Sequence, residues 1–233
     1  MSAYLRQLAA SGRIRGVAFD LDGTLLDTLP DIADSGNAML SELGRPVVDE
    51  AVVRSYIGDG IPKLVKRLLT GTREAEPEAL LFENANRIFQ ARYAERLDVR
   101  TRPYPGAVDG IGRLRRAGFK LAVVTNKAER FARPLLDAHF GAGAFDLVLG
   151  GDSLAKKKPD PMPILHCCEH FGIVPAGLLV VGDSANDVAA GLAAGCPVVC
   201  VPYGYTGGLD VRSLGADAIV PDILSVAVGL HPE

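Results

Sequence analysis

Two aspartates at the end of an apolar segment are the first residues that could do chemistry. The apolar residues 17–19 run directly into Asp-Leu-Asp-Gly-Thr at 20–24. The carboxylates of Asp20 and Asp22 repel each other, so both stay ionised at low cost only beside a cation, unless one takes up a proton. A divalent metal ion is the simplest interpretation. Gly23 permits a tight turn and Thr24 can donate its hydroxyl within the same loop, although a plain Asp-Gly turn closing a strand has the same sequence.

Polar residues follow apolar runs at two more places, and a basic segment lies between them. An apolar pair ends in Thr125-Asn126-Lys127, and a longer apolar run ends in the segment 182–187, which contains Asp183 and Asp187. A lysine triplet followed by proline occupies 156–159. The carboxyl ends of parallel strands open onto one edge of a sheet, so these groups can converge although they are far apart in the chain.

A set of this kind suits phosphoryl transfer. Carboxylates bind a hard cation such as Mg²⁺, a lysine and neutral donors bind phosphate oxygens, and one carboxylate remains free to attack phosphorus. The sequence lacks the Gly-x4-Gly-Lys-Ser/Thr motif of nucleotide-binding loops. We therefore expect hydrolysis of a small phosphate ester rather than ATP-dependent phosphorylation.

The elements that must position these residues follow a βαβ rhythm. After the first strand, further strands are predicted at 120–125, 146–149, 177–181, 197–201 and 218–220, with helices at 107–117, 129–139, 162–171 and 186–194. The strands are short, continuously apolar and rich in valine, which is typical of a parallel sheet covered on both faces. The predicted fold class is α/β, a doubly wound parallel sheet.

A helical insert interrupts this core. Between 28 and 101 no convincing strand is visible, and apolar residues recur at helical spacing over 32–43, 47–57, 61–69 and 76–97. We predict an α/β core formed by residues 1–28 and 102–233, and a helical cap domain over 29–101. The natural hinges are the two crossings, near 27–29 and 100–103.

Composition limits the partners and the compartment. The 233 residues carry 25 Lys and Arg against 28 Asp and Glu, a net charge of −3, which gives no overall attraction to nucleic acid or an anionic membrane. No apolar run approaches the ~20 residues that span a bilayer, and the N-terminus makes a poor signal peptide. We expect a cytoplasmic monomer or homodimer whose partner is a small phosphate ester, with no nucleic acid and no membrane.

The cysteines fit a reducing compartment. Cys167, Cys168, Cys196 and Cys200 form no C-x-x-C pair, so we expect reduced core residues. The neighbouring pair His166 and His170 has helical spacing, but without a second ligand cluster a metal site there is disfavoured.

Four motifs together resemble one known superfamily. Asp20-x-Asp22-Gly23-Thr24, Thr125-Asn126, Lys158-Pro159 and Gly182-Asp183-Ser184-x-x-Asp187 match, in order, the motifs of the haloacid dehalogenase superfamily. The helical insert is similar to the cap that this superfamily places between its first and second motifs. The resemblance covers nearly the whole chain.

The resemblance implies roles for the aspartates. Asp20 corresponds to the nucleophile that forms an aspartyl-phosphate, and Asp22 to the general acid and base that protonates the leaving alcohol and later activates water. Mg²⁺ would be held by Asp20, the backbone carbonyl of Asp22 and Asp183. Asp187 either lies near the metal and orients its waters or anchors its own helix.

The resemblance also implies which groups bind the phosphoryl oxygens, namely Thr125, Asn126 and Lys158. Lys158 can in addition neutralise Asp20 before an anionic nucleophile approaches an anionic ester. The two preceding lysines, 156–157, are expected to form a solvated face.

Two further polar residues have open roles. Asp27 either lies next to the catalytic residues or caps the following helix. Asn186 is interpreted as a residue that starts its helix rather than as a ligand.

Substrate choice is expected to come from the cap. The segment Gly58-Asp59-Gly60 precedes a helix and offers backbone amides for a substrate carboxylate, or it is a simple turn. With the segments 150–154 and 201–205, it is similar to bacterial phosphoglycolate phosphatases, which implies hydrolysis of 2-phosphoglycolate to glycolate and phosphate. The alternatives are a phosphatase of sugar or amino-sugar phosphates, a phosphomutase, and a non-catalytic sensor of phosphate ligands.

Overall fold

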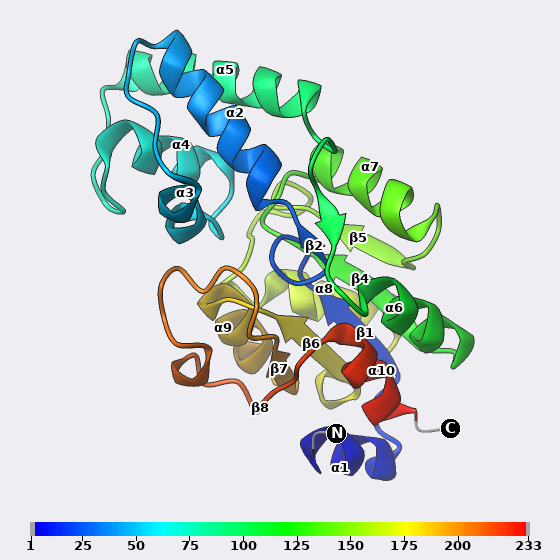
Figure 1. Cartoon of the computed structure of the whole chain (residues 1–233). Helices are drawn as coiled ribbons and strands as arrows, with labels where there is room; N and C mark the ends of the chain where they lie inside the picture. The colour runs from blue at the N-terminus through cyan, green and yellow to red at the C-terminus, as the bar shows by residue number, and fades with distance from the viewer. Residues whose placement is uncertain (1–2, 232–233) are drawn as a thin grey trace.

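The computed structural model of the chain describes residues 3–231 and is built around a six-stranded parallel sheet. Every neighbouring pair in the order β5, β4, β1, β6, β7, β8 is parallel (Figure 1). The bounds are β1 (Gly16–Phe19), β4 (Lys120–Val124), β5 (Leu147–Leu149), β6 (Leu178–Gly182), β7 (Val198–Cys200) and β8 (Ala218–Ile219). The chain winds outward from β1 in both directions, which confirms the predicted doubly wound α/β class.

Successive strand residues point to opposite faces of this sheet. Both faces carry apolar side chains, and a layer of helices covers each of them. Val17 and Phe19 of β1 pack into one core cluster, whereas Ala18 between them packs into another. The first face is covered by α1 (Ala3–Ser11), α6 (Ala107–Arg116), α7 (Glu129–Phe140) and α10 (Ile223–Leu230), and the second by α8 (Met162–Phe171) and α9 (Ala185–Ala193). Single turns η1 (Pro175–Gly177) and η2 (Val211–Ser213) complete the core.

Four helices between β2 and β3 form a separate group that we call the cap. They are α2 (Leu29–Glu42), α3 (Glu50–Tyr56), α4 (Ile61–Thr70) and α5 (Ala79–Glu95). Their own buried cluster contains Met39, Val53, Val65 and Phe89. Figure 1 shows the group to one side of the sheet, at the upper left.

The two crossings between core and cap lie side by side. β2 (Leu26–Asp27) and β3 (Arg102–Pro103) pair in antiparallel fashion, a short ribbon that the sequence did not predict. Next to it, the buried carboxylate of Asp31 accepts hydrogen bonds from the backbone N–H groups of Arg100 and Thr101. These contacts fasten the return crossing to the first turn of α2.

Two terminal helices were also missed by the sequence analysis. α1 and α10 lie side by side (Figure 1), and Leu5 packs against Gly229 so closely that a Cβ there would lie 2.7 Å from the Cβ of Leu5. α10 is almost entirely apolar, so it has no polar stripe from which helical periodicity could be recognised.

Two expectations from composition can be compared with the structure. Within residues 3–231 the four cysteines are buried and free, as expected. Among the helices of the described residues, none is both long enough and apolar enough to cross a membrane.

Candidate active site

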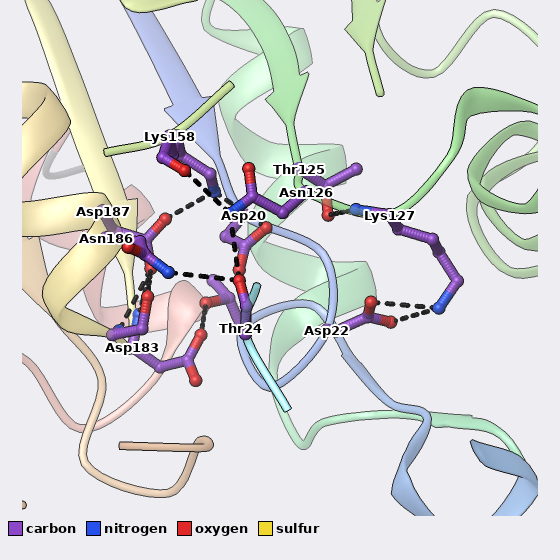
Figure 2. A network of polar contacts seen from close by, with 12 residues as sticks. Asp20, Asp22, Thr24, Thr125, Asn126, Lys127, Lys158, Asp183, Asn186 and Asp187 are labelled. Carbon is purple, nitrogen blue, oxygen red and sulfur yellow. Dashed lines mark hydrogen bonds and ion pairs between the residues drawn. The ribbon is translucent and has the colours of Figure 1, made fainter. Parts of the chain in front are cut away.

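The central strands deliver the predicted site residues to one edge of the sheet. Phe19 pairs in register with Val123 of β4 and Val181 of β6, so the residues that follow these three positions emerge together. Asp20 comes directly after β1, and its backbone N–H donates to the carbonyl of Val181 at 3.0 Å. Figure 2 shows Asp20, Thr125 and Lys158 gathered with the acidic residues that follow β6.

Three carboxylates form an acidic cluster. Asp20, Asp183 and Asp187 each offer one oxygen, and these oxygens lie within 4.8 Å of one another. Burial raises the pKa of Asp20 to about 6, against the opposing charge of Lys158. Burial and the charges of Asp20 and Asp187 raise the pKa of Asp183 well above its usual value. The cluster thus holds more negative charge than its neighbours compensate.

Lys158 is the positive group beside this cluster. Its Nζ lies 3.0 Å from Asp20 Oδ1 and 2.5 Å from Asp187 Oδ1. Burial favours the neutral amine, but the two carboxylates outweigh burial and raise the pKa of Lys158. Asp187 also accepts from the backbone N–H and hydroxyl of Ser184, which start α9. The Asp187 side chain therefore anchors the start of α9 and also lies in the acidic cluster, while its predicted role in orienting metal-bound water stays a prediction.

A close cradle orients Asp183. Its two oxygens accept from the Thr24 hydroxyl at 2.6 Å and from the backbone N–H of Tyr205 at 2.5 Å. A Cβ on Gly23 would lie 2.4 Å from Asp183 Oδ2, and one on Gly204 would lie 2.2 Å from Asp183 Cβ. The Thr24 hydroxyl thus donates to the loop after β6. The prediction that it donates within its own loop is wrong.

The donor set fits a hard divalent cation. It consists of carboxylate oxygens, which are the ligands that Mg²⁺ prefers. Two buried carboxylates and the partly buried Asp20 beside Lys158 leave a surplus of negative charge that such a cation would neutralise. Asp20, Asp183 and Asp187 are therefore the residues that could hold a metal ion.

Asp22 has a different environment. Its carboxylate accepts from Lys127 Nζ at 2.7 and 3.0 Å and from the Thr28 hydroxyl at 2.7 Å. Lys127 is only 5 % exposed, and Asp22 outweighs the effect of burial and raises the pKa of the lysine. The sequence analysis placed Lys127 among the polar residues after β4 but gave it no role. Its position directly after Asn126 was the sequence signal that could have assigned Lys127 to the site.

Asn126 joins the core to the cap. Its Nδ2 donates at 3.0 Å both to the Gly58 carbonyl and to the Lys158 carbonyl. Within residues 3–231 its Oδ1 is buried without a hydrogen-bond partner. The neighbouring Thr125 hydroxyl accepts from the Lys127 backbone N–H at 3.2 Å.

The predicted cap loop reaches the core through Asp59. The Asp59 carboxylate binds Arg67 at 2.6 Å and accepts from Asn186 Nδ2 at 2.9 Å. Although burial opposes it, these two partners lower the pKa of Asp59. Lys157 Nζ donates to the Asp59 carbonyl at 2.7 Å. The prediction of a solvated face is therefore wrong for Lys157, because the cap covers it, and Asn186 contacts the cap besides starting its helix.

A sequence model of the family described as haloacid dehalogenase-like hydrolase matches residues 14–195. The chain belongs to the haloacid dehalogenase-like hydrolases. The enzyme class predicted from the four motifs is thereby confirmed.

Individual relatives of this hydrolase carry a narrower name. It is 54 % identical to the phosphoglycolate phosphatase of Nitrosospira multiformis, over 90 % of this chain and 92 % of that protein. It is 48 % identical to that of Thiobacillus denitrificans, over 92 % and 95 %. A crystal structure described as a "predicted phosphoglycolate phosphatase" from Haemophilus somnus superposes with a TM-score of 0.87 at 36 % identity, covering 92 % of this chain and 96 % of that one. These comparisons confirm the predicted resemblance both to the haloacid dehalogenase superfamily and to the phosphoglycolate phosphatases.

Between core and cap, the hydrolase encloses a small cavity. Its volume is about 40 Å³. The core and the cap loop contribute Asp20, Asp22, Thr125, Asn126, Lys127, Gly58 and Gly60, and the cap helices and their flanks contribute Ile32, Ile57, Ile61, Leu64, Phe89 and Tyr93. The predicted Gly58 and Gly60 thus face the cavity, whereas Asp59 is bound to Arg67 beside it.

A tyrosine strap after β7 connects the hydrolase core to the start of the cap. The Tyr205 hydroxyl donates to Asp27 at 2.6 Å and accepts from the backbone N–H groups of Thr28 and Leu29, each at 3.0 Å. From the cap side, Arg54 donates to the carbonyls of Tyr203 and Gly204. The residue at the start of α2 is Thr28, so Asp27 does not cap this helix; instead its carboxylate accepts from Tyr205, whose backbone N–H donates to Asp183.

Proposed function

We propose that this hydrolase is a Mg²⁺-dependent phosphatase that converts 2-phosphoglycolate to glycolate and phosphate through an aspartyl-phosphate. The observation that carries the proposal is the separation of the two aspartates of the first motif. Asp20 lies against Lys158 in the acidic cluster, whereas Asp22 lies apart, against Lys127. This separation supports Asp20 as the attacking carboxylate and Asp22 as the group that handles a proton. The names of the relatives support the choice of substrate.

The metal site is proposed on Asp20, Asp183 and Asp187, together with the backbone carbonyl of Asp22. When bound, Mg²⁺ would offset negative charge on the phosphate and on the attacking carboxylate. The cradle of Thr24 and the Tyr205 backbone keeps Asp183 oriented for this purpose.

The residues of the chain then divide the reaction. Asp20 forms a bond to phosphorus as the ester P–O bond breaks, and Asp22, which enters this step as the protonated acid, gives its proton to the leaving glycolate oxygen and becomes the carboxylate that Lys127 stabilises. Water next attacks the aspartyl-phosphate while Asp22 takes up one of its protons, and phosphate leaves Asp20. Lys158 neutralises Asp20 before the attack, and Lys158, Thr125 and Asn126 bind the transferring oxygens.

The cap completes the site from the other side. Gly58 and Gly60 border the cavity, and contacts of Asn126, Lys157 and Asn186 hold their loop in place. We propose that this loop closes over the substrate and excludes water during the attack. The proposed partner is thus one small phosphate ester in a cytoplasmic enzyme.

The test is kcat/KM with Mg²⁺ for 2-phosphoglycolate against sugar phosphates, amino-sugar phosphates and nucleotides. We expect a preference for 2-phosphoglycolate of at least two decades, about 2.7 kcal/mol. Asp20→Asn is the blank, and chelation followed by added Mg²⁺ checks the metal. A peak on a sugar phosphate would refute the substrate, phosphoryl return without release of phosphate would indicate a mutase, and binding without turnover would indicate a sensor.

A further inference from the structure

A buried tyrosine lines the cavity beside the two aspartates of the first motif. Tyr93 lies on α5, is 1 % exposed and lines the cavity together with Asp20 and Asp22. Among residues 3–231 its hydroxyl has no hydrogen-bond partner. A buried hydroxyl without a partner costs free energy, so such groups in a native site call for a ligand. Burial raises the pKa of Tyr93 to about 12, so the hydroxyl is protonated and available as a donor.

Lys127 offers a second donor at the same place. Its Nζ lies 4.9 Å from the centre of the Tyr93 ring, and its side chain contacts the Tyr93 hydroxyl. An ammonium group has three N–H donors. Two of them are directed at the oxygens of Asp22, at 2.7 and 3.0 Å. Apart from their contact with each other, the third N–H of Lys127 and the O–H of Tyr93 have no partner among the described residues, so the pair matches the two oxygens of a carboxylate.

The position of this pair fits the shape of a short substrate. In 2-phosphoglycolate a single methylene separates the ester oxygen from the carboxylate. Asp22 is the residue proposed to protonate that ester oxygen, so the carboxylate must lie beside Asp22, where Lys127 is. Lys158 is bound to Asp20 and Asp187 instead and belongs to the phosphate end (Figure 2).

The rest of the described cap lining offers the backbone of Gly58 and Gly60 but no charged side chain. Among the described residues that line the cavity, Lys127 is the one cationic side chain. The cap side is apolar, with Ile32, Ile57, Leu64 and Phe89. Sugar hydroxyl groups would lose water there without finding partners, which costs free energy. A carboxylate, in contrast, meets a charge and a hydroxyl.

We propose that the Tyr93 hydroxyl and the Lys127 ammonium form a carboxylate subsite, which selects small phosphate esters of hydroxy acids. The inference rests on the proposed function, because it assigns one end of the same substrate. The subsite lies at the junction of the two parts of the molecule, with Lys127 from the core and Tyr93 from the cap. A bound carboxylate would therefore favour the closed arrangement.

The test compares 2-phosphoglycolate with ethyl phosphate, which keeps the ester and replaces the carboxylate by a methyl group. The measured quantity is the ratio of the two kcat/KM values. We expect Tyr93→Phe to lower this ratio at least ~10-fold, the effect of one hydrogen bond to a charged group. Tyr56→Phe, which removes a hydroxyl elsewhere in the cap, serves as the matched control and should leave the ratio within about twofold, well below that effect.

A second variant and a binding measurement separate the possible failures. Lys127→Gln should lower the ratio as well and should raise the inhibition constant of glycolate at least ~10-fold. A wild type that does not distinguish the two esters would refute the proposed function. A wild type that prefers 2-phosphoglycolate, with that preference intact in Tyr93→Phe and Lys127→Gln, would refute the subsite alone.

Discussion

Removing the Tyr205 hydroxyl should destabilise the protein although Tyr205 lies far from α2 in the sequence. The hydroxyl is buried, with the residue 2 % exposed, and it binds Asp27 and the backbone N–H groups of Thr28 and Leu29. The first N–H groups of a helix have no partner within the helix. In the described structure the Thr28 side chain makes no capping bond. The Tyr205 hydroxyl, which lies outside the helix, therefore accepts the hydrogen bonds of the backbone N–H groups at the start of α2.

The size of the effect follows from the groups left without partners in Tyr205→Phe. Each buried polar group without a partner costs about 1–3 kcal/mol. Asp27 is half-buried and can turn to water, so the two backbone amides dominate, and partial hydration favours the lower part of the range. We expect a loss of about 2–4 kcal/mol in the free energy of unfolding. For a chain of this size, that lowers the Tm by roughly 4–16 °C.

Urea denaturation and thermal unfolding measure this loss, with Tyr203→Phe as the control. Tyr203 donates a single hydrogen bond, to the Thr24 carbonyl at 2.9 Å, so its loss should cost less. Because Asp27 and Tyr205 share a bond, Asp27→Ala combined with Tyr205→Phe should destabilise by less than the sum of the single variants. Equal stability of Tyr205→Phe and the wild type would show that water replaces the hydroxyl and would refute the reasoning.

Three further predictions concern the acidic cluster. Mg²⁺ at 100 times its dissociation constant should stabilise the wild type by about 2.7 kcal/mol, and Asp183→Asn should lose most of the resulting shift in Tm; an equal shift in the variant would place the metal elsewhere. Thr24→Val removes the 2.6 Å hydrogen bond to Asp183 and should weaken Mg²⁺ binding about 10–100-fold in titration calorimetry. Gly204→Ala should lower both the Tm and the Mg²⁺ affinity, because the new Cβ would lie 2.2 Å from Asp183 Cβ; unchanged values would mean that the loop yields easily.

The sequence was sufficient for the parts of the site that depend on local order. Strands at the centre of a parallel sheet are continuous apolar runs, so the polar residue after each run marks its carboxyl end. This reasoning located Asp20, Thr125 and Asp183 because each needs only its own strand to be placed. The geometry of their convergence then follows from the parallel order of β4, β1 and β6.

The sequence analysis did not predict contacts between residues that lie far apart in the chain. Lys127 and Asp22 are 105 residues apart, and Tyr205 and Thr28 are 177 apart. No spacing or periodicity announces such pairs, because they exist only after the cap has been set against the core. The burial of Lys157 has the same origin, since the loop that covers it comes from the cap. Sequence reasoning therefore failed mainly at the boundary between the two parts.

That boundary also supports the residues that do the chemistry. Asn126, Lys157 and Asn186 bind the backbone of Gly58 or Asp59, and each of the three is itself a site residue or stands next to one. Asn126 in addition donates to the Lys158 carbonyl, so one side chain after β4 contacts both the cap loop and the segment that carries Lys158. Displacing the cap breaks these bonds and releases the core loops that they hold. Under the proposed function, closure of the cap and alignment of the proposed catalytic groups are expected to be one event, so that a cap without catalytic carboxylates of its own would influence the rate as well as the choice of substrate.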